Sequence, residues 1–171
     1  MGRTDIATAI ADARTWVTTH RAEARYRDSA ATATVDDGLR MRVVSADGAS
    51  ITTDMTAGVG GGGSAPSPGW LLRAANASCI ATLIAMRAAE LGTDLDGLEV
   101  TVDSESDDAG LLDVDASVPS GPLSMRVSVR VAATSGPEDQ LREIVAWGVA
   151  HCPVCDAVKR AVPVEVVVAV G

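Results

Sequence analysis

One long helical segment, apolar on every side, constrains the fold more than any other feature of this sequence. Pro68 stands near the first helical position, and Gly92 follows the predicted end near residue 91. Between Arg73 and Arg87 the residues are apolar or small around the whole helix. Because a helix of that kind is normally buried, we predict that this helix is buried on every side.

Strand signals stand on both sides of this helix. They alternate between apolar and polar residues and are separated by turn residues such as Asp37-Gly38 and Asp47-Gly48. We predict three short antiparallel strands before the helix and three after it, at 31–35, 39–43, 51–55, 98–102, 111–118 and 123–131.

The remaining segments complete an α+β plan. Helical periodicity covers residues 5–25, a second helix follows Ser135, a short one follows Pro153, and residues 162–170 form an apolar final strand. Strands grouped apart from helices indicate the α+β class. The glycine-rich loop from Gly58 to Ser67 lacks the lysine of a phosphate-binding loop, so we predict a flexible connection there.

Composition excludes several classes of partner. The 171 residues carry 14 basic and 23 acidic side chains, a net charge of −9, so nucleic acid and anionic membranes are not expected partners. Aromatic residues are only 2%, which removes the rings that stack on bases. The apolar stretch 74–86 falls short of the roughly 18 residues of a membrane span. The first 20 residues contain no long apolar run typical of a signal peptide, and we expect a cytoplasmic protein.

Three cysteines carry the candidate chemistry. A cysteine inside a buried helix, such as Cys79, is either a small core residue or a nucleophile. Cys152 directly precedes Pro153, so its sulfur lies at a helix N-terminus, where backbone N–H groups favour a thiolate. His151 beside it is a candidate base, and the alternative role of Cys152 is packing at the start of the helix.

Cys152-Pro-Val-Cys155 also forms a C-x-x-C pattern, which can cycle as a dithiol or contribute to a zinc site. Zinc needs four ligands, and only Cys79 or His20 remains to complete a set with the clustered residues 151–155. We expect no metal and no cofactor. With two histidines and no G-x-S-x-G pattern, serine-nucleophile chemistry has no support.

Two cysteine segments in this order resemble the OsmC/Ohr family, which comprises osmotically induced protein C and organic hydroperoxide resistance proteins. The first is Pro66-Ser-Pro-Gly-Trp-Leu-Leu-Arg-Ala-Ala-Asn-Ala-Ser-Cys79-Ile-Ala-Thr-Leu, followed by Gly92-Thr-Asp-Leu-Asp-Gly-Leu-Glu-Val. The second is Ala150-His-Cys-Pro-Val-Cys155 with the closing Val162-Pro-Val-Glu-Val. The resemblance covers residues 28–171, which leaves residues 1–27 as an N-terminal helical extension.

The resemblance implies antiparallel sheets wrapped around long central helices in an intertwined homodimer. It also implies a thiol peroxidase in which Cys79 attacks an organic hydroperoxide and becomes a sulfenic acid, and Cys152 then forms a disulfide with it. An external dithiol would restore the enzyme. Cys155 falls where the family usually has serine, so it is an extra thiol.

The chain departs from the family at the start of the central helix. Family peroxidases usually carry a glutamate there, paired with an arginine that activates the thiolate. The corresponding position falls on Gly69-Trp70, and no acidic residue lies between Gly58 and Ser78. Arg40 and Arg42 lie in the matching hairpin. The alternative function is therefore a divergent member that binds an apolar small molecule at the dimer interface without peroxidase activity.

Overall fold

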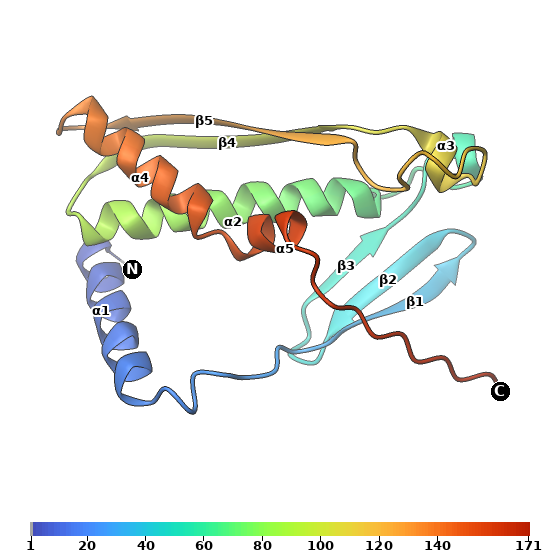
Figure 1. The fold of residues 1–171 in the computed structure, drawn as a ribbon, viewed down its shortest axis with the longest axis horizontal. Helices are drawn as coiled ribbons and strands as arrows, with labels where there is room; N and C mark the ends of the chain where they lie inside the picture. Colours follow the sequence, from blue (N-terminus) through green and yellow to red (C-terminus); the bar gives the residue numbers. More distant parts are fainter. Residues whose placement is uncertain (1) are drawn as a thin grey trace. The chain divides into compact units, whose positions relative to one another are not determined.

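The computed structural model describes residues 2–171, which form helices and antiparallel sheets (Figure 1). This arrangement confirms the predicted α+β class. Contacts divide the chain into two compact units, residues 7–75 and residues 76–171, the second of which also takes in the first helical turn up to Ile6. The predicted division between residues 27 and 28 does not coincide with these units and stays a prediction.

The unit of residues 7–75 contains a three-stranded antiparallel meander, as predicted. Strands β1 (Ala31–Asp37), β2 (Arg40–Ser45) and β3 (Ser50–Thr53) pair in sequence order. The turns contain Gly38 and Gly48, whose φ angles of 54° and 91° favour glycine. Helix α1 (Arg3–Thr19) precedes the sheet; it ends earlier than predicted and has no buried residue.

The glycine-rich loop is ordered around a carboxylate and is not the flexible connection predicted. A short 3-10 helix, η1 (Ala57–Val59), opens it. The buried Asp54 accepts hydrogen bonds from the backbone N–H groups of Met55 (2.8 Å), Gly62 (3.3 Å) and Ser64 (2.9 Å), and from the Ser64 hydroxyl (2.8 Å). A Cβ atom at Gly61 would lie 2.0 Å from the Met55 carbonyl oxygen, so only glycine fits there.

Helix α2 (Pro68–Glu90) begins at the predicted proline and ends just before Gly92, whose φ is 69°. Within the chain only one stripe of it is buried, where we predicted burial all round. The stripe consists of Asn76, Ile80, Ile84, Ala88 and Ala89. The rest of this chain covers one face of the helix, so its other apolar side chains remain partly accessible.

By length and composition, α2 is also able to cross a membrane, because an 18-residue window in it has a mean hydropathy of 1.3. The apolar stretch 74–86 alone is shorter than such a span, as the sequence analysis noted. One helix of this kind is weak evidence for a membrane span, since the central helix of a water-soluble domain has the same properties.

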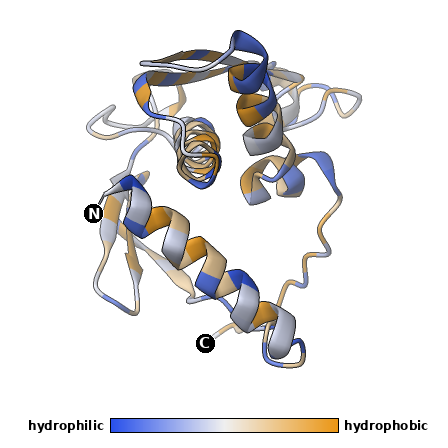
Figure 2. Cartoon of the chain, turned by 90° about the vertical axis from the view of Figure 1, so that its left-hand side faces the viewer, coloured by the Kyte–Doolittle hydropathy of each residue, from blue (hydrophilic) through white to orange (hydrophobic). Residues whose placement is uncertain are grey.

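The second unit packs α2 against a two-stranded sheet and two helices. The antiparallel strands are β4 (Leu95–Glu105) and β5 (Ser124–Ala133), and the helices are α4 (Glu138–Ala150) and α5 (Pro153–Lys159). Figure 2 looks along α2, with the sheet above it and the two helices beside it. Ile80 and Ile84 of α2 meet Ile144 of α4 in the core.

Two predicted strands are absent from this unit. Residues 111–118 form turns after the short helix α3 (Asp108–Leu111), because the Asp107 carboxylate accepts a hydrogen bond from the Ala109 N–H and starts a helix. Residues 162–170 run without any strand pairing, and their valines are exposed, Val170 by 93%. A strand needs a neighbouring edge, and this segment finds none within the described chain.

Candidate active site

The structure brings together three thiols that are far apart in the sequence. Cys79 lies near the middle of α2, Cys152 is the N-cap residue of α5, and Cys155 lies in the first turn of α5. Cys79 packs against the buried cluster that contains Cys152, and the two thiols lie close enough to shift each other's pKa. All three cysteines are free, so this is the reduced state of the cluster.

Close packing between α4 and α2 explains this meeting. Gly148 of α4 lies so near Ile84 of α2 that a Cβ atom there would be 2.7 Å from the isoleucine Cγ1. The chain leaves α4 at Ala150 and begins α5 at Pro153. The start of α5, which carries Cys152, therefore lies against the same side of α2.

A buried amide completes the cluster. The thiol of Cys155 donates a hydrogen bond to Oδ1 of Asn76, with 2.9 Å between sulfur and oxygen, and Cys152 Sγ lies 4.0 Å from the same oxygen. Asn76 is only 3% exposed. Asn76 was not among the site residues predicted from the sequence. The available signal was its position three residues before Cys79, which puts both side chains on one face of the helix.

The three thiols differ in how readily they ionise. Burial raises the pKa of Cys152, but the hydrogen bond from the Cys155 N–H (3.2 Å to Sγ) and the interactions with the neighbouring thiols of Cys79 and Cys155 outweigh it, so the pKa lies below its usual range. Burial and the interaction with Cys152 raise the pKa of Cys79. Burial and its interactions with Cys152 raise the pKa of Cys155 to about 11. The first proton lost therefore leaves its negative charge on Cys152.

Burial decides which sulfur an incoming molecule meets first. Cys152 is 1% exposed and Cys155 is 5% exposed, whereas Cys79 is only partly buried. Leu83 and Val154, both partly buried, pack against the same core cluster as Cys79. A small molecule that approaches the cluster thus reaches Cys79 beside apolar side chains.

The ring of His151 is held against its own helix. Its Nδ1 lies 2.8 Å from the carbonyl oxygen of Trp147 and must donate to it, and its ring stacks on the Trp147 ring at 4.1 Å. The guanidinium of Arg87 lies over that indole, 5.3 Å from its centroid. These three side chains form a stack of their own at the end of α4.

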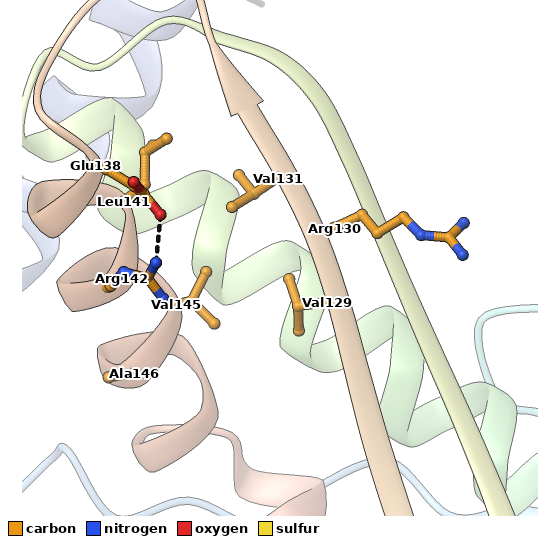
Figure 3. A pocket seen from close by; sticks show the side chains of 8 residues that line it. All are labelled: Val129, Arg130, Val131, Glu138, Leu141, Arg142, Val145 and Ala146. Atoms are coloured by element: carbon orange, nitrogen blue, oxygen red, sulfur yellow. Dashed lines mark hydrogen bonds and ion pairs between the residues drawn. The ribbon is translucent and has the colours of Figure 1, made fainter.

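A groove of about 620 Å³ lies between β5 and α4 in the same unit (Figure 3). Val129, Val131, Leu141 and Val145 give it apolar walls, and an ion pair between Glu138 and Arg142 stands at its edge. No cysteine lines it. Across residues 2–171, no three or more histidine, cysteine or acidic side chains are arranged to hold a metal ion.

Of the two arginines of the predicted hairpin, Arg40 is engaged within its own unit. Arg40 pairs with Asp36 at 2.9 Å and donates to the Ser64 hydroxyl at 3.1 Å. These residues belong to the unit of residues 7–75, whereas Cys79 belongs to the other unit. The causes that set the thiol pKa values are instead burial, backbone N–H groups and the neighbouring thiols themselves.

Comparison with known proteins settles the family. A family model described as OsmC-like protein matches residues 61–167, more than half of the chain. The chain belongs to the OsmC-like protein family. No curated protein matches this OsmC-like chain.

Solved structures share the fold of this OsmC-like protein at low sequence identity. An organic hydroperoxide resistance protein OsmC from Legionella pneumophila is 20% identical, with 79% of this chain and 91% of that chain covered and a TM-score of 0.58. The organic hydroperoxide resistance protein OhrB of Bacillus subtilis is 21% identical, with 79% and 93% covered and a TM-score of 0.51. An OsmC-like protein from Mycoplasma pneumoniae is 14% identical, with 80% and 91% covered and a TM-score of 0.66.

Proposed function

We propose that this OsmC-like protein is a thiol-dependent peroxidase that reduces organic hydroperoxides with Cys79 and Cys152. The observation that carries the proposal is the packing of Cys79, from α2, against the buried cluster that contains Cys152, from the start of α5, where the two thiols shift each other's pKa. Two thiols in contact can form a disulfide, and a disulfide stores the two electrons that a peroxide removes. Two of the structural relatives are named as organic hydroperoxide resistance proteins.

In the first step, the sulfur of Cys79 attacks the distal oxygen of the hydroperoxide. Cys152, the more acidic thiol of the pair, loses its proton first, and its thiolate then accepts the Cys79 proton. The O–O bond breaks, Cys79 becomes a sulfenic acid, and the alkoxide leaves and takes up a proton to form the alcohol. The accessible sulfur thus reacts while the buried one acts as its base.

In the second step, the sulfur of Cys152 attacks the sulfenic sulfur of Cys79. A disulfide forms, and the sulfenic hydroxyl leaves as water. An external dithiol then reduces the disulfide and returns both thiols. The apolar side chains near Cys79 favour a hydroperoxide with an alkyl or aryl group over hydrogen peroxide.

A peroxide-consumption assay tests this function. We expect the wild-type protein to consume cumene hydroperoxide continuously in the presence of dithiothreitol and to prefer it to hydrogen peroxide. Cys79→Ser removes the nucleophile and should abolish consumption, whereas Cys152→Ser removes the resolving thiol and should leave Cys79 as a sulfenic acid that dimedone traps. Wild-type consumption no faster than that of Cys79→Ser would overturn the proposal.

A second candidate function is non-catalytic binding of an apolar small molecule at a dimer interface. Two observations favour it: the pKa of Cys79 is raised by burial and its interaction with Cys152, and the chain has no acidic residue between Gly58 and Ser78. Under this function Cys79→Ser would leave ligand binding intact. The peroxide assay separates the two candidates, since only a peroxidase consumes hydroperoxide.

We also propose that the working form is a homodimer. Residues 162–170 are apolar and unpaired, and α2 buries only one stripe of its apolar surface within the chain. A second copy supplies both a strand edge for this segment and a cover for the remaining face of α2. This arrangement protects apolar surface that one chain leaves in water.

A further inference from the structure

The two-cysteine reaction leaves one buried thiol without a role. Cys155 is 5% exposed, its thiol interacts with Cys152, and its backbone N–H lies 3.2 Å from Cys152 Sγ. A spacing of three residues across the first turn of a helix is one that a disulfide can bridge. Cys155 is therefore a second possible partner for the sulfur of Cys152.

Cys152 is the sulfur that both other thiols share. It interacts with the thiol of Cys79 and accepts a hydrogen bond from the backbone N–H of Cys155, 3.2 Å from its Sγ. The Oδ1 atom of Asn76 lies 2.9 Å from Cys155 Sγ and 4.0 Å from Cys152 Sγ. The Asn76 amide thus holds the Cys155 thiol beside Cys152 Sγ, which is one of the two sulfurs of the proposed disulfide.

We infer that Cys155 exchanges with the Cys79–Cys152 disulfide and moves it to Cys152–Cys155. The Cys155 sulfur, as thiolate, attacks Cys152 Sγ; the bond between Cys152 and Cys155 forms while the bond between Cys79 and Cys152 breaks. Cys79 leaves as a thiolate and takes up the proton that Cys155 lost. No oxidant or reductant is consumed, and one disulfide remains throughout. The inference rests on the proposed function for the disulfide that starts the exchange.

Ionisation of the three thiols changes in a direction that helps the exchange. In the reduced cluster, burial and the interactions with Cys152, including the charge of its thiolate, raise the pKa of Cys155 to about 11. Once Cys152 is part of a disulfide, that charge is gone, so Cys155 ionises more readily than before. The Cys155 thiol thus ionises less readily in the reduced cluster and more readily once the disulfide has formed.

The exchange returns Cys79 to its thiol form before any reductant arrives. A wild-type chain without reductant then reacts with a second hydroperoxide and ends with a sulfenic acid on Cys79 and a disulfide between Cys152 and Cys155. A chain that lacks the third thiol stops at the Cys79–Cys152 disulfide. Wild type should therefore consume two equivalents of hydroperoxide per chain, and Cys155→Ser only one.

Peptide mapping reads the position of the disulfide directly. Complete tryptic digestion places Cys79 in peptide 74–87 and both Cys152 and Cys155 in peptide 143–159. After one equivalent of cumene hydroperoxide and acid quenching, we expect wild type to show alkylated Cys79 and an internal disulfide in the second peptide. The Cys155→Ser variant should show the two peptides joined by a disulfide.

A parallel oxidation with diamide, which makes disulfides without a peroxide, separates this inference from the proposed function. A joined pair of peptides in wild type after either oxidant overturns the exchange, and the proposed function stands if hydroperoxide is consumed. An internal disulfide after diamide without hydroperoxide consumption overturns the peroxidase and, with it, the exchange, because diamide can oxidise Cys152 and Cys155 directly. If Cys155→Ser fails to fold, Cys155→Ala replaces it, and the wild-type map alone still decides the outcome.

Discussion

At the level of single residues, the amide of Asn76 sets the electrostatic conditions of the thiol cluster. It is buried, it accepts a hydrogen bond from Cys155, and it brings no charge near the ionised sulfur of Cys152. Asparagine is uncommon in a buried helix interior because its polar groups need partners. Here the partner is a thiol, and the amide in turn fixes where that thiol points.

Asn76→Asp tests this role, because aspartate has the same shape and adds a negative charge. A like charge within about 4 Å disfavours ionisation, so the pKa of Cys152 should rise. The wild-type protein should show one thiol that ionises below the usual cysteine range and Cys155 near the pKa of about 11, followed by thiolate absorbance at 240 nm.

Ser128→Asp provides the matched control, since it adds the same charge at an exposed position of β5, on the side of the strand opposite Val127 and Val129. Water screens that charge, so the titration should remain close to wild type. An unchanged Cys152 titration in Asn76→Asp would show that the amide does not set the thiolate environment.

At the level of whole elements, the contact between α4 and α2 at Gly148 positions the start of α5 on the cluster. Gly148→Ala places a Cβ atom 2.7 Å from Ile84 Cγ1 and 3.0 Å from its backbone nitrogen, so the two helices must separate. Overpacking of this kind costs about 1–3 kcal/mol. We expect a loss of that size in the free energy of unfolding by urea, together with slower formation of the Cys79–Cys152 disulfide.

Gly69→Ala is the control for this substitution. Gly69 lies in the first turn of α2, and a Cβ atom there has its nearest contacts at 3.9 Å. Alanine should be neutral or stabilise the helix by up to about 1 kcal/mol. Equal unfolding free energies for both variants would contradict the close approach at Gly148.

At the level of the whole molecule, the unpaired segment 162–170 determines the proposed assembly. Deletion of residues 162–171 removes the strand that a second copy would pair with, so the chain should sediment as a monomer where the intact protein sediments as a dimer. Val166→Asp with Val168→Asp keeps the length and places charges on two exposed valines. Sedimentation velocity checks all three proteins, and a monomeric wild type would overturn the dimer.

Local rules allowed the sequence to predict several elements closely. Proline at position 68 and glycine at position 92 bound α2 as expected, and Pro153 begins α5. The alternation of apolar and polar residues predicted β5 correctly, with one face of the strand partly buried and the other in water. The strand predicted at residues 111–118 was wrong for a local reason as well, since Asp107 caps a short helix that the alternating pattern did not indicate. Periodicity, capping and turn residues act over a few positions, and those are visible in a sequence.

Contacts between distant segments were decided only by the tertiary structure. The sequence named Cys79 and Cys152, but the place of Asn76 beside Cys155 depends on how α4 crosses α2 at Gly148, which no short-range pattern encodes. The order of thiol ionisation follows from those same hydrogen bonds and from burial. For the apolar residues 162–170, the sequence determined a preference for an extended backbone. Whether this segment pairs as a strand depends on a free strand edge nearby, and only the tertiary structure decides that.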